Sequence, residues 1–190
     1  MSERTETMYH TFVVYVENKP GVLSRVVSLF RRRSFNIDSL TVGRTEKPEV
    51  SRMTIVVDSD EDQARRIVAN VYKLVNVPLV DDITHQASIA RDLCLIKISA
   101  PQEVRSQVLE LATVFRARVV DIAPDSIILE ITGFEEKVDR LLEMLRPFGL
   151  LEVVRTGLVA MRRGMQMTKS AAKSSGVTQV ADDGTVSYSV

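Results

Sequence analysis

The sequence lacks several residues on which large classes of proteins depend. Its 190 residues include one cysteine and no tryptophan, and aromatic side chains make up only 5% of the chain. The single cysteine, Cys94, excludes an intrachain disulfide, and its place in the apolar run 93–96 predicts a buried core residue. No window approaches the roughly 20 apolar residues of a membrane-spanning helix, and the polar start, 1–7, does not resemble a signal peptide. We therefore expect a protein of the cytoplasm with no membrane partner.

An excess of charge of one sign is also missing. Lysine plus arginine and aspartate plus glutamate both total 25, so the formal net charge is zero. No overall field attracts nucleic acid, and the paired aromatics of an RNA-binding sheet are not evident. The run Arg31, Arg32 and Arg33 is interpreted as the solvated end of a helix, with a phosphate or partner patch as the alternative. No nucleic-acid partner is expected.

Motifs of metal binding and catalysis are absent from the sequence as well. Neither His10 nor His85 is accompanied by a set of cysteines or carboxylates at metal-ligand spacing. No Ser-His-Asp or Cys-His arrangement and no glycine-rich phosphate-binding motif occurs. The sequence therefore predicts no metal site, no catalytic residue and no bound cofactor in this chain.

What the sequence does contain is one pattern twice, because hydrophobic periodicity switches between 2 and 3.6 in the order βαββαβ in 8–87 and again in 91–163. In the first copy we expect strands and helices at 9–17, 20–33, 36–44, 50–58, from 60 onward and at 79–86. In the second copy we expect them at 92–99, from 101 onward, at 117–123, 126–132, after 133 and at 149–156. Each copy then places two helices on one face of a four-stranded antiparallel sheet. The prediction is an α+β protein with two tandem ferredoxin-like domains.

Two further expectations follow from composition along the chain. Strands such as 12–16 and 53–57 are apolar on both sides, so the sheet face without helices needs cover, and we expect a homodimer to provide it. The segment 164–190 is rich in Ser, Thr, Lys and Gly, and we expect it to be a disordered tail.

The most informative local signal is the break in the first apolar run at Asn18, Lys19, Pro20 and Gly21. Pro20 fits the first turn of a helix, and Gly21 permits a ligand to approach the backbone closely. Unpaired N–H groups at a helix start attract a carboxylate, and the Asn18 amide can donate and accept hydrogen bonds. An ordinary strand-to-helix turn uses the same residue types, so the motif alone leaves that alternative open.

The second copy provides an internal control for this loop. At an offset of about 81 residues Pro20 corresponds to Pro101, whereas Asn18 corresponds to Ser99 and Gly21 to Gln102. The helix start is kept but the residues suited to a ligand are not. We therefore expect effector binding only in the first copy.

Three ordered blocks of sequence carry a resemblance to a known family. They are Glu-Asn-x-x-Gly-x-Leu-Ser-Arg-Val from Glu17, Asn-Ile-x-Ser-Leu-Thr-Val from Asn36 and Ser-Arg-Met-Thr-Ile from Ser51. In this order and spacing they resemble the ACT domain of the small regulatory subunits of acetolactate synthase. The resemblance extends to about residue 163.

The resemblance implies that valine binds between two ACT domains. Leucine and isoleucine are expected to overlap with it, because one methylene against an apolar wall is worth only about 1–3 kcal/mol. Carried over by position, the site comprises Asn18, Pro20, Gly21, Val22 and Leu23 of one subunit with Asn36 and Ile37 of the other. The N–H groups of residues 21–23 would hold the ligand carboxylate and Asn18 its polar end. Asn36 would make the cross-subunit hydrogen bond, and Ile37 would form an apolar wall.

The resemblance also implies a regulatory role in branched-chain amino acid biosynthesis. The chain would activate a large catalytic subunit, which carries thiamine diphosphate, magnesium and flavin, and would confer feedback inhibition by valine. The alternative is a stand-alone ACT-type amino-acid sensor for another enzyme. An acylphosphatase-like enzyme on the same fold needs an arginine in the loop after the first strand, where this sequence offers only Lys19.

Overall fold

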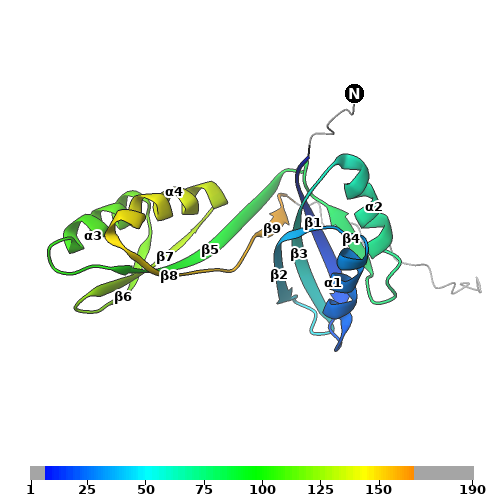
Figure 1. Ribbon diagram of the computed structural model, residues 1–190. Helices are drawn as coiled ribbons and strands as arrows, with labels where there is room; N and C mark the ends of the chain where they lie inside the picture. The colour runs from blue at the N-terminus through cyan, green and yellow to red at the C-terminus, as the bar shows by residue number, and fades with distance from the viewer. Residues whose placement is uncertain (1–6, 165–190) are drawn as a thin grey trace, which may run out of the picture.

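In the computed structural model, residues 7–164 are described, and they form two sheets that each carry two helices (Figure 1). The α+β class and the two ferredoxin-like units predicted from the sequence are confirmed. The predicted tail, 164–190, lies outside the described residues except for Gly164. None of the helices within 7–164 is long and apolar enough to cross a membrane.

The first unit follows the predicted order closely. Its elements are β1 (Met8–Glu17), α1 (Val22–Arg32), β2 (Ile37–Arg44), β3 (Val50–Ser59), α2 (Glu61–Val71) and β4 (Leu79–Asp82). The strands pair antiparallel in the order β2-β3-β1-β4. Alternate residues of β1, Phe12, Val14 and Val16, point into the core, where they meet Val26 and Phe30 of α1. The inward-facing residues of the strands and the apolar residues of the helices therefore pack together in one hydrophobic layer.

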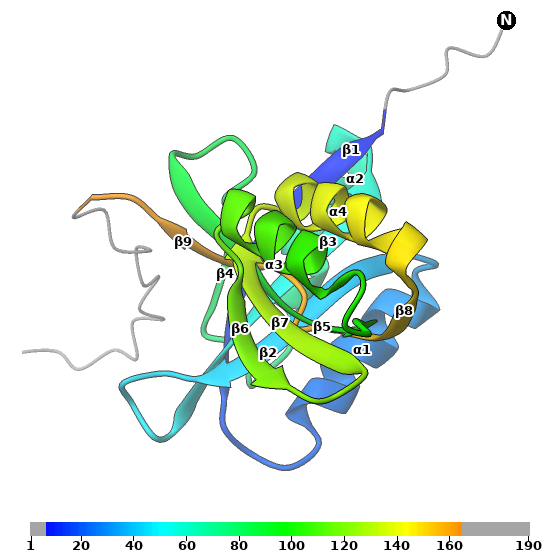
Figure 2. The ribbon, with the colours of Figure 1, turned by 90° about the vertical axis from the view of Figure 1, so that its left-hand side faces the viewer.

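The second unit repeats this arrangement with different bounds. Its elements are β5 (Ser88–Ser99), α3 (Arg105–Val114), β6 (Arg118–Ile122), β7 (Ser126–Gly133), α4 (Glu135–Leu145), the 3-10 turn η1 (Arg146–Phe148) and β8 (Leu150–Arg155). The strand order is β6-β7-β5-β8, and α3 and α4 lie together over one face (Figure 2). Cys94 is buried in the core of this unit, as predicted.

Several predicted bounds differ from the structure, and strand β5 begins at Ser88 rather than at position 92. Helix α1 begins at Val22 rather than at position 20, because Gly21 adopts the left-handed conformation and is the N-cap. Helix α3 begins at Arg105 rather than at Pro101, because Pro101 starts a separate turn. The Pro101 carbonyl accepts hydrogen bonds from the N–H groups of Val104 and Arg105. Strand β4 ends at Asp82, four residues earlier than predicted.

A short strand that the periodicity did not predict, β9 (Val159–Arg162), returns the chain to the first unit (Figures 1 and 2). It pairs with the first four residues of β5, and Ala160 packs with Val13 and Ile83 on the helix-free face of the first sheet. Arg52 donates a hydrogen bond to the Ala160 carbonyl, and Arg162 forms an ion pair with Asp81. The chain itself thus covers part of the face for which the sequence predicted a homodimer. The homodimer stays a prediction.

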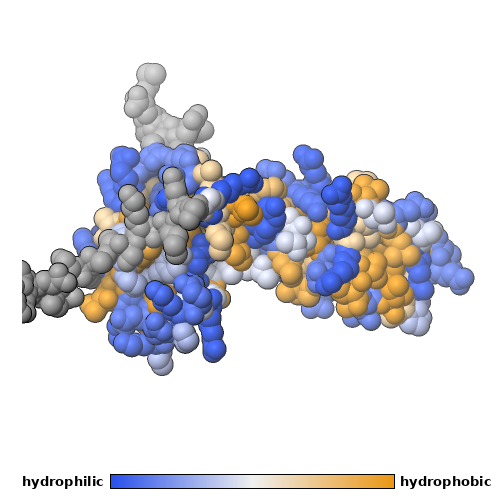
Figure 3. Space-filling model, turned by 180° about the vertical axis from the view of Figure 1, so that it is seen from behind, coloured by the Kyte–Doolittle hydropathy of each residue, from blue (hydrophilic) through white to orange (hydrophobic). Residues whose placement is uncertain are grey.

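The helix-free face of the second sheet carries apolar side chains in the open. Leu93 and Leu95 of β5 are exposed there, and Val154 of β8 lies beside Leu95. Seen from behind, hydrophobic residues gather over this unit (Figure 3). The two units therefore differ, because only the first has part of its open sheet face covered by β9.

Candidate functional site

The loop between β1 and α1 turns on Gly21. Its φ of 81° lies in the left-handed region, where residues with a Cβ are strained. A Cβ placed on Gly21 would meet nothing within 4 Å, so the backbone angle and not crowding requires glycine. Asn18 to Gly21 and Leu23 are exposed, whereas Val22 is buried in the core. Val22 therefore anchors the loop in the core, and the other loop residues stay at the surface.

The start of α1 presents unpaired donors. The Val22 N–H reaches the Lys19 carbonyl at a long 3.4 Å, and the N–H groups of Gly21 and Leu23 donate to no other described residue. The first turn of α1 contains no acidic side chain, and no side chain caps it. Because nothing offsets the partial positive charge of the helix start, this position suits a carboxylate.

Asn18 is oriented by the turn between β2 and β3. Its backbone N–H donates to the Glu49 carbonyl at 2.7 Å, and its side-chain Nδ2 donates to the Pro48 carbonyl at 3.0 Å. These bonds leave the side-chain Oδ1, which accepts no hydrogen bond from residues 7–164. Asn18 can therefore serve a ligand mainly as an acceptor, which suits an ammonium group.

A polar chain that the sequence reasoning did not assign runs beside this loop. The Glu17 carboxylate accepts from Asn76 Nδ2 at 2.7 Å and lies 2.9 Å from Lys19 Nζ, and the Asn76 Oδ1 accepts from Arg25 Nη1 at 2.7 Å. The hydrogen bonds from Lys19 and then Asn76 lower the pKa of Glu17 below its ordinary value. Arg25 lies one turn after Gly21, and its N–H donates to the Gly21 carbonyl at 3.1 Å. In the sequence it stood in the first of the three blocks, with no role assigned to it.

The other two predicted site residues lie at the far end of the first sheet. Ile37 pairs with Val57, which pairs with His10 near the start of β1, whereas the loop follows the end of β1. Asn36 is exposed and Ile37 is half-buried. Helix α1, with 11 residues, spans about 16 Å between the two places at 1.5 Å per residue. One chain therefore does not bring the seven predicted residues together.

The described residues offer no candidate metal site. In the part of the chain that the structure describes, no group of three or more His, Cys, Asp or Glu side chains is placed to hold a metal ion. His10 is buried next to Asp82 and Thr84, and His85 contacts Glu61 at the surface. Neither histidine therefore belongs to a metal-binding group of the described residues.

Comparison with known proteins decides the family. Residues 12–78 match the model of the AHAS small subunit-like ACT domain, and residues 91–164 match the model described as the small subunit of acetolactate synthase. The chain belongs to the acetolactate synthase small subunit family. The resemblance found in the sequence is confirmed.

Relatives in this family match most of the chain. A probable acetolactate synthase small subunit of Archaeoglobus fulgidus is 51% identical over 157 residues, which cover 83% of this chain and 98% of the relative. An acetolactate synthase small subunit of Mycolicibacterium smegmatis is 45% identical and covers 86% of this chain and 95% of its own. The crystal structure of the small subunit from Thermotoga maritima matches with a TM-score of 0.77 at 36% identity, over 83% of this chain and 98% of that one.

Proposed function

We propose that this chain is the non-catalytic regulatory subunit of an acetolactate synthase in the cytoplasm. It activates the large catalytic subunit, which holds thiamine diphosphate, magnesium and flavin, and it makes that enzyme sensitive to valine. The observation that carries the proposal is the left-handed Gly21 with unpaired N–H groups at the start of α1, in an ACT domain of this family. Residues 8–87 sense the effector, and residues 91–163 serve structure or the partner subunit.

The chemistry of the loop supports an amino acid as effector. The Gly21 and Leu23 N–H groups hold the carboxylate, and the Val22 N–H can be shared with the Lys19 carbonyl. The Asn18 Oδ1 accepts from the ammonium group, because its Nδ2 is already bonded. Each hydrogen bond to a charged group contributes roughly 1.5–3 kcal/mol. One methylene against an apolar wall is worth only about 1–3 kcal/mol, so leucine and isoleucine compete with valine.

A homodimer completes the site through the edge of the first sheet. Strand β2 is outermost in the order β2-β3-β1-β4, and its outer edge pairs with no strand in residues 7–164. Two copies joined by antiparallel β2 edges place the start of one β2 beside the end of the other. Because Arg44 at the end of β2 lies level with Ser51 and Val16, that end is the loop end of the sheet. The partner's Asn36 and Ile37 then lie near Gly21.

The test is calorimetric titration of the full chain with valine, leucine and isoleucine, and with lysine as an unrelated amino acid. Gly21→Asp puts a carboxylate where the effector carboxylate binds, and we expect it to abolish valine binding. Gly21→Asn is the matched control, because the asparagine side chain has the shape of aspartate but carries no charge. Both residues tolerate the left-handed backbone conformation that position 21 requires. We expect Gly21→Asn to keep valine binding within about threefold, less than one lost hydrogen bond would cost.

The same variants are then assayed with the large subunit. Gly21→Asp should still activate the catalytic subunit while inhibition by valine disappears. Valine binding of full strength in Gly21→Asp would refute the site. Binding of no branched-chain amino acid by either the chain or its complex with the large subunit would instead indicate a subunit that activates without sensing.

A further inference from the structure

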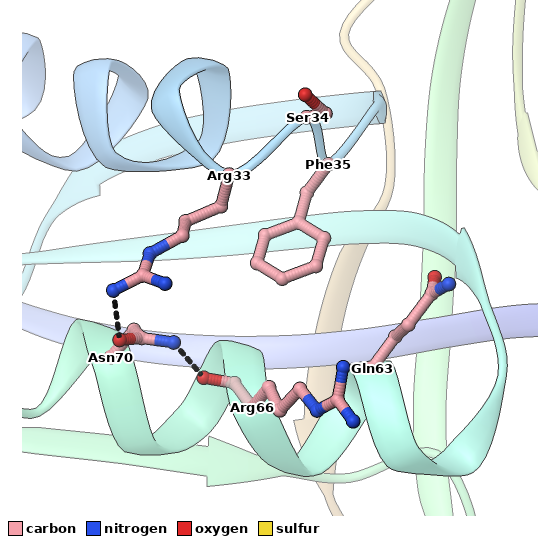
Figure 4. A pocket seen from close by; sticks show the side chains of 6 residues that line it. All are labelled: Arg33, Ser34, Phe35, Gln63, Arg66 and Asn70. Atoms are coloured by element: carbon pink, nitrogen blue, oxygen red, sulfur yellow. Dashed lines mark hydrogen bonds between the residues drawn. The ribbon is translucent and has the colours of Figure 1, made fainter.

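A second concave site lies between the end of α1 and helix α2 (Figure 4). It is a cavity of about 350 Å³, lined by Arg33, Ser34, Phe35, Gln63, Arg66 and Asn70. The Arg33 and Phe35 side chains point from the end of α1 toward α2, from which the side chains of Gln63, Arg66 and Asn70 project (Figure 4). The cavity is far from the effector loop, because the whole of α1 separates Arg33 from Gly21.

The two arginines of this cavity have guanidinium N–H donors without partners among the described residues. Neither Arg33 nor Arg66 forms an ion pair with a described carboxylate, whereas the neighbouring Arg65 is paired with Asp62. Arg33 Nη2 reaches Asn70 Oδ1 only at 3.4 Å, and the Arg66 guanidinium makes no hydrogen bond within residues 7–164. Two guanidinium groups therefore face one cavity without an internal counter-charge.

The end of α1 opposes a negative ligand less than a bare helix end would, because the carbonyls of Leu29, Phe30 and Arg31 already accept hydrogen bonds. The Arg33 N–H donates to the carbonyls of Leu29 and Phe30, the Ser34 N–H to that of Arg31, and the Phe35 N–H again to that of Phe30. Ser34 takes the left-handed conformation that ends the helix, with φ of 56°. This turn places the Phe35 ring as an apolar wall, in edge contact with Phe30.

We propose that this cavity binds a small anion of the phosphate class that carries at least two negative charges. Guanidinium groups match the oxygens of a phosphate by paired hydrogen bonds, and two of them balance a divalent charge. The Gln63 amide at the rim supplies a further donor, and the Phe35 ring excludes water from one side. All three arginines at the end of α1 are exposed, as the sequence suggested, and Arg33 also lines this cavity.

The experiment is a titration of the full chain with inorganic pyrophosphate at low ionic strength. Calorimetry measures the binding, and NMR of the side-chain amides monitors the same titration. We expect saturable binding of one ion per chain, with shifts of the Gln63 and Asn70 amide signals. Arg33→Gln and Arg66→Gln should each weaken binding at least about tenfold, since each removes charge-assisted hydrogen bonds. Arg33→Lys keeps the positive charge but loses the paired N–H donors of the guanidinium. Its affinity for pyrophosphate should lie between that of the wild type and that of Arg33→Gln.

Arg32→Gln is the matched control, because Arg32 lies on the same helix end and its Nε donates to the Ser28 carbonyl outside the cavity. It should change pyrophosphate binding less than about twofold. A loss in Arg32→Gln as large as in Arg33→Gln, or no saturable binding by the wild type, would overturn the proposal. Gly21→Asp should leave pyrophosphate binding intact, so the outcome is independent of the effector site.

Discussion

The backbone N–H of Leu158 donates a hydrogen bond to the Ser39 hydroxyl at 3.0 Å, and this bond joins the two units of the chain. Beside it, the Thr41 hydroxyl donates to the Thr156 carbonyl at 3.3 Å. Ser39 and Thr41 both belong to β2, the strand that begins with Ile37 of the proposed effector site. The strand that begins in the proposed effector site therefore also holds the segment 156–158, through which the chain leaves the second sheet.

The two hydrogen bonds between β2 and the segment 156–158 form a joint between the units. This joint predicts that a change in it alters inhibition by valine without altering the binding of valine. If the effector acts on the second unit through β2, Ser39→Ala should leave valine binding within about threefold but weaken the coupling, which is typically worth 1–3 kcal/mol. The measurement compares valine affinity by calorimetry with the valine concentration that half-inhibits the complex with the large subunit. Ser28→Ala, which removes a hydroxyl from α1 away from the joint, should change neither quantity. Equal shifts of both quantities in Ser39→Ala would contradict the route.

Gly157 is the tightest point of the same joint. Its φ is +82°, and an added Cβ would lie 2.6 Å from Ser39 Oγ and 3.1 Å from Thr41 Oγ1. We expect Gly157→Ala to lower the free energy of unfolding by more than the roughly 1–2 kcal/mol that the left-handed backbone alone costs. Urea unfolding followed by circular dichroism measures the change.

Gly43 supplies the control for this substitution. It lies on β2, its φ is not positive, and an added Cβ would meet nothing within 4 Å. Gly43→Ala should therefore change the stability by no more than about 0.5 kcal/mol. The double variant Gly157→Ala with Ser39→Ala should lose less free energy of unfolding than the two single variants lose together. The reason is that Ser39→Ala removes the oxygen that lies closest to the added Cβ. Wild-type stability of Gly157→Ala would show that the joint is not formed as described.

The sequence predicted what depends on local patterns. Alternation in β1 and the spacing of apolar residues in α1 gave both elements within two residues, because those patterns reflect burial against a single layer. The ligand-suited loop was found for the same reason, since Asn, Pro and Gly at a strand-to-helix turn are a local signal. The offset to the second copy restricts the predicted effector site to the first unit, and that restriction stays a prediction.

What the sequence did not predict depends on contacts between distant residues. Strand β9 has only four residues, which is too short for a periodicity, and it forms because it pairs with β5 about 70 positions earlier and buries Ala160 on Val13. The bond from Asn18 to Pro48 spans 30 positions, and that from Arg25 to Asn76 spans 51. No spacing rule relates such pairs, so the donor and acceptor roles at the site required the fold.

The carboxylate of Glu17 makes the loop sensitive to acid. Its pKa is lowered below the ordinary 4.5 by hydrogen bonds from Lys19 and Asn76. A group with a lowered pKa in the folded state stabilises the fold above its unfolded pKa, and this contribution is lost as the pH falls through the folded value. We therefore expect the polar chain from Lys19 to Arg25 to open only below pH 4.5.

Carboxyl-selective NMR of Glu17 during an acid titration measures this directly. Asn76→Ala removes one of the two hydrogen bonds and should raise the pKa of Glu17 toward 4.5. Asn70→Ala, an equivalent change on α2 that does not touch Glu17, should leave that pKa where it is. A pKa at or above 4.5 in the wild type would mean that the polar chain does not form in solution.

The single thiol provides a probe of the second core. Cys94 is fully buried between β5 and the helices, and burial raises the pKa of its thiol, with Arg155 acting in the opposite direction. Because the thiolate is the reactive form, the native chain at pH 8 should react with an alkylating reagent at least about a hundredfold slower than a free thiol. Labelling should accelerate only when urea opens this unit. A Val114→Cys, Cys94→Ala variant is the reactive control, since Val114 is 75% exposed. Rapid labelling of the native wild type would mean that the second unit opens readily in solution.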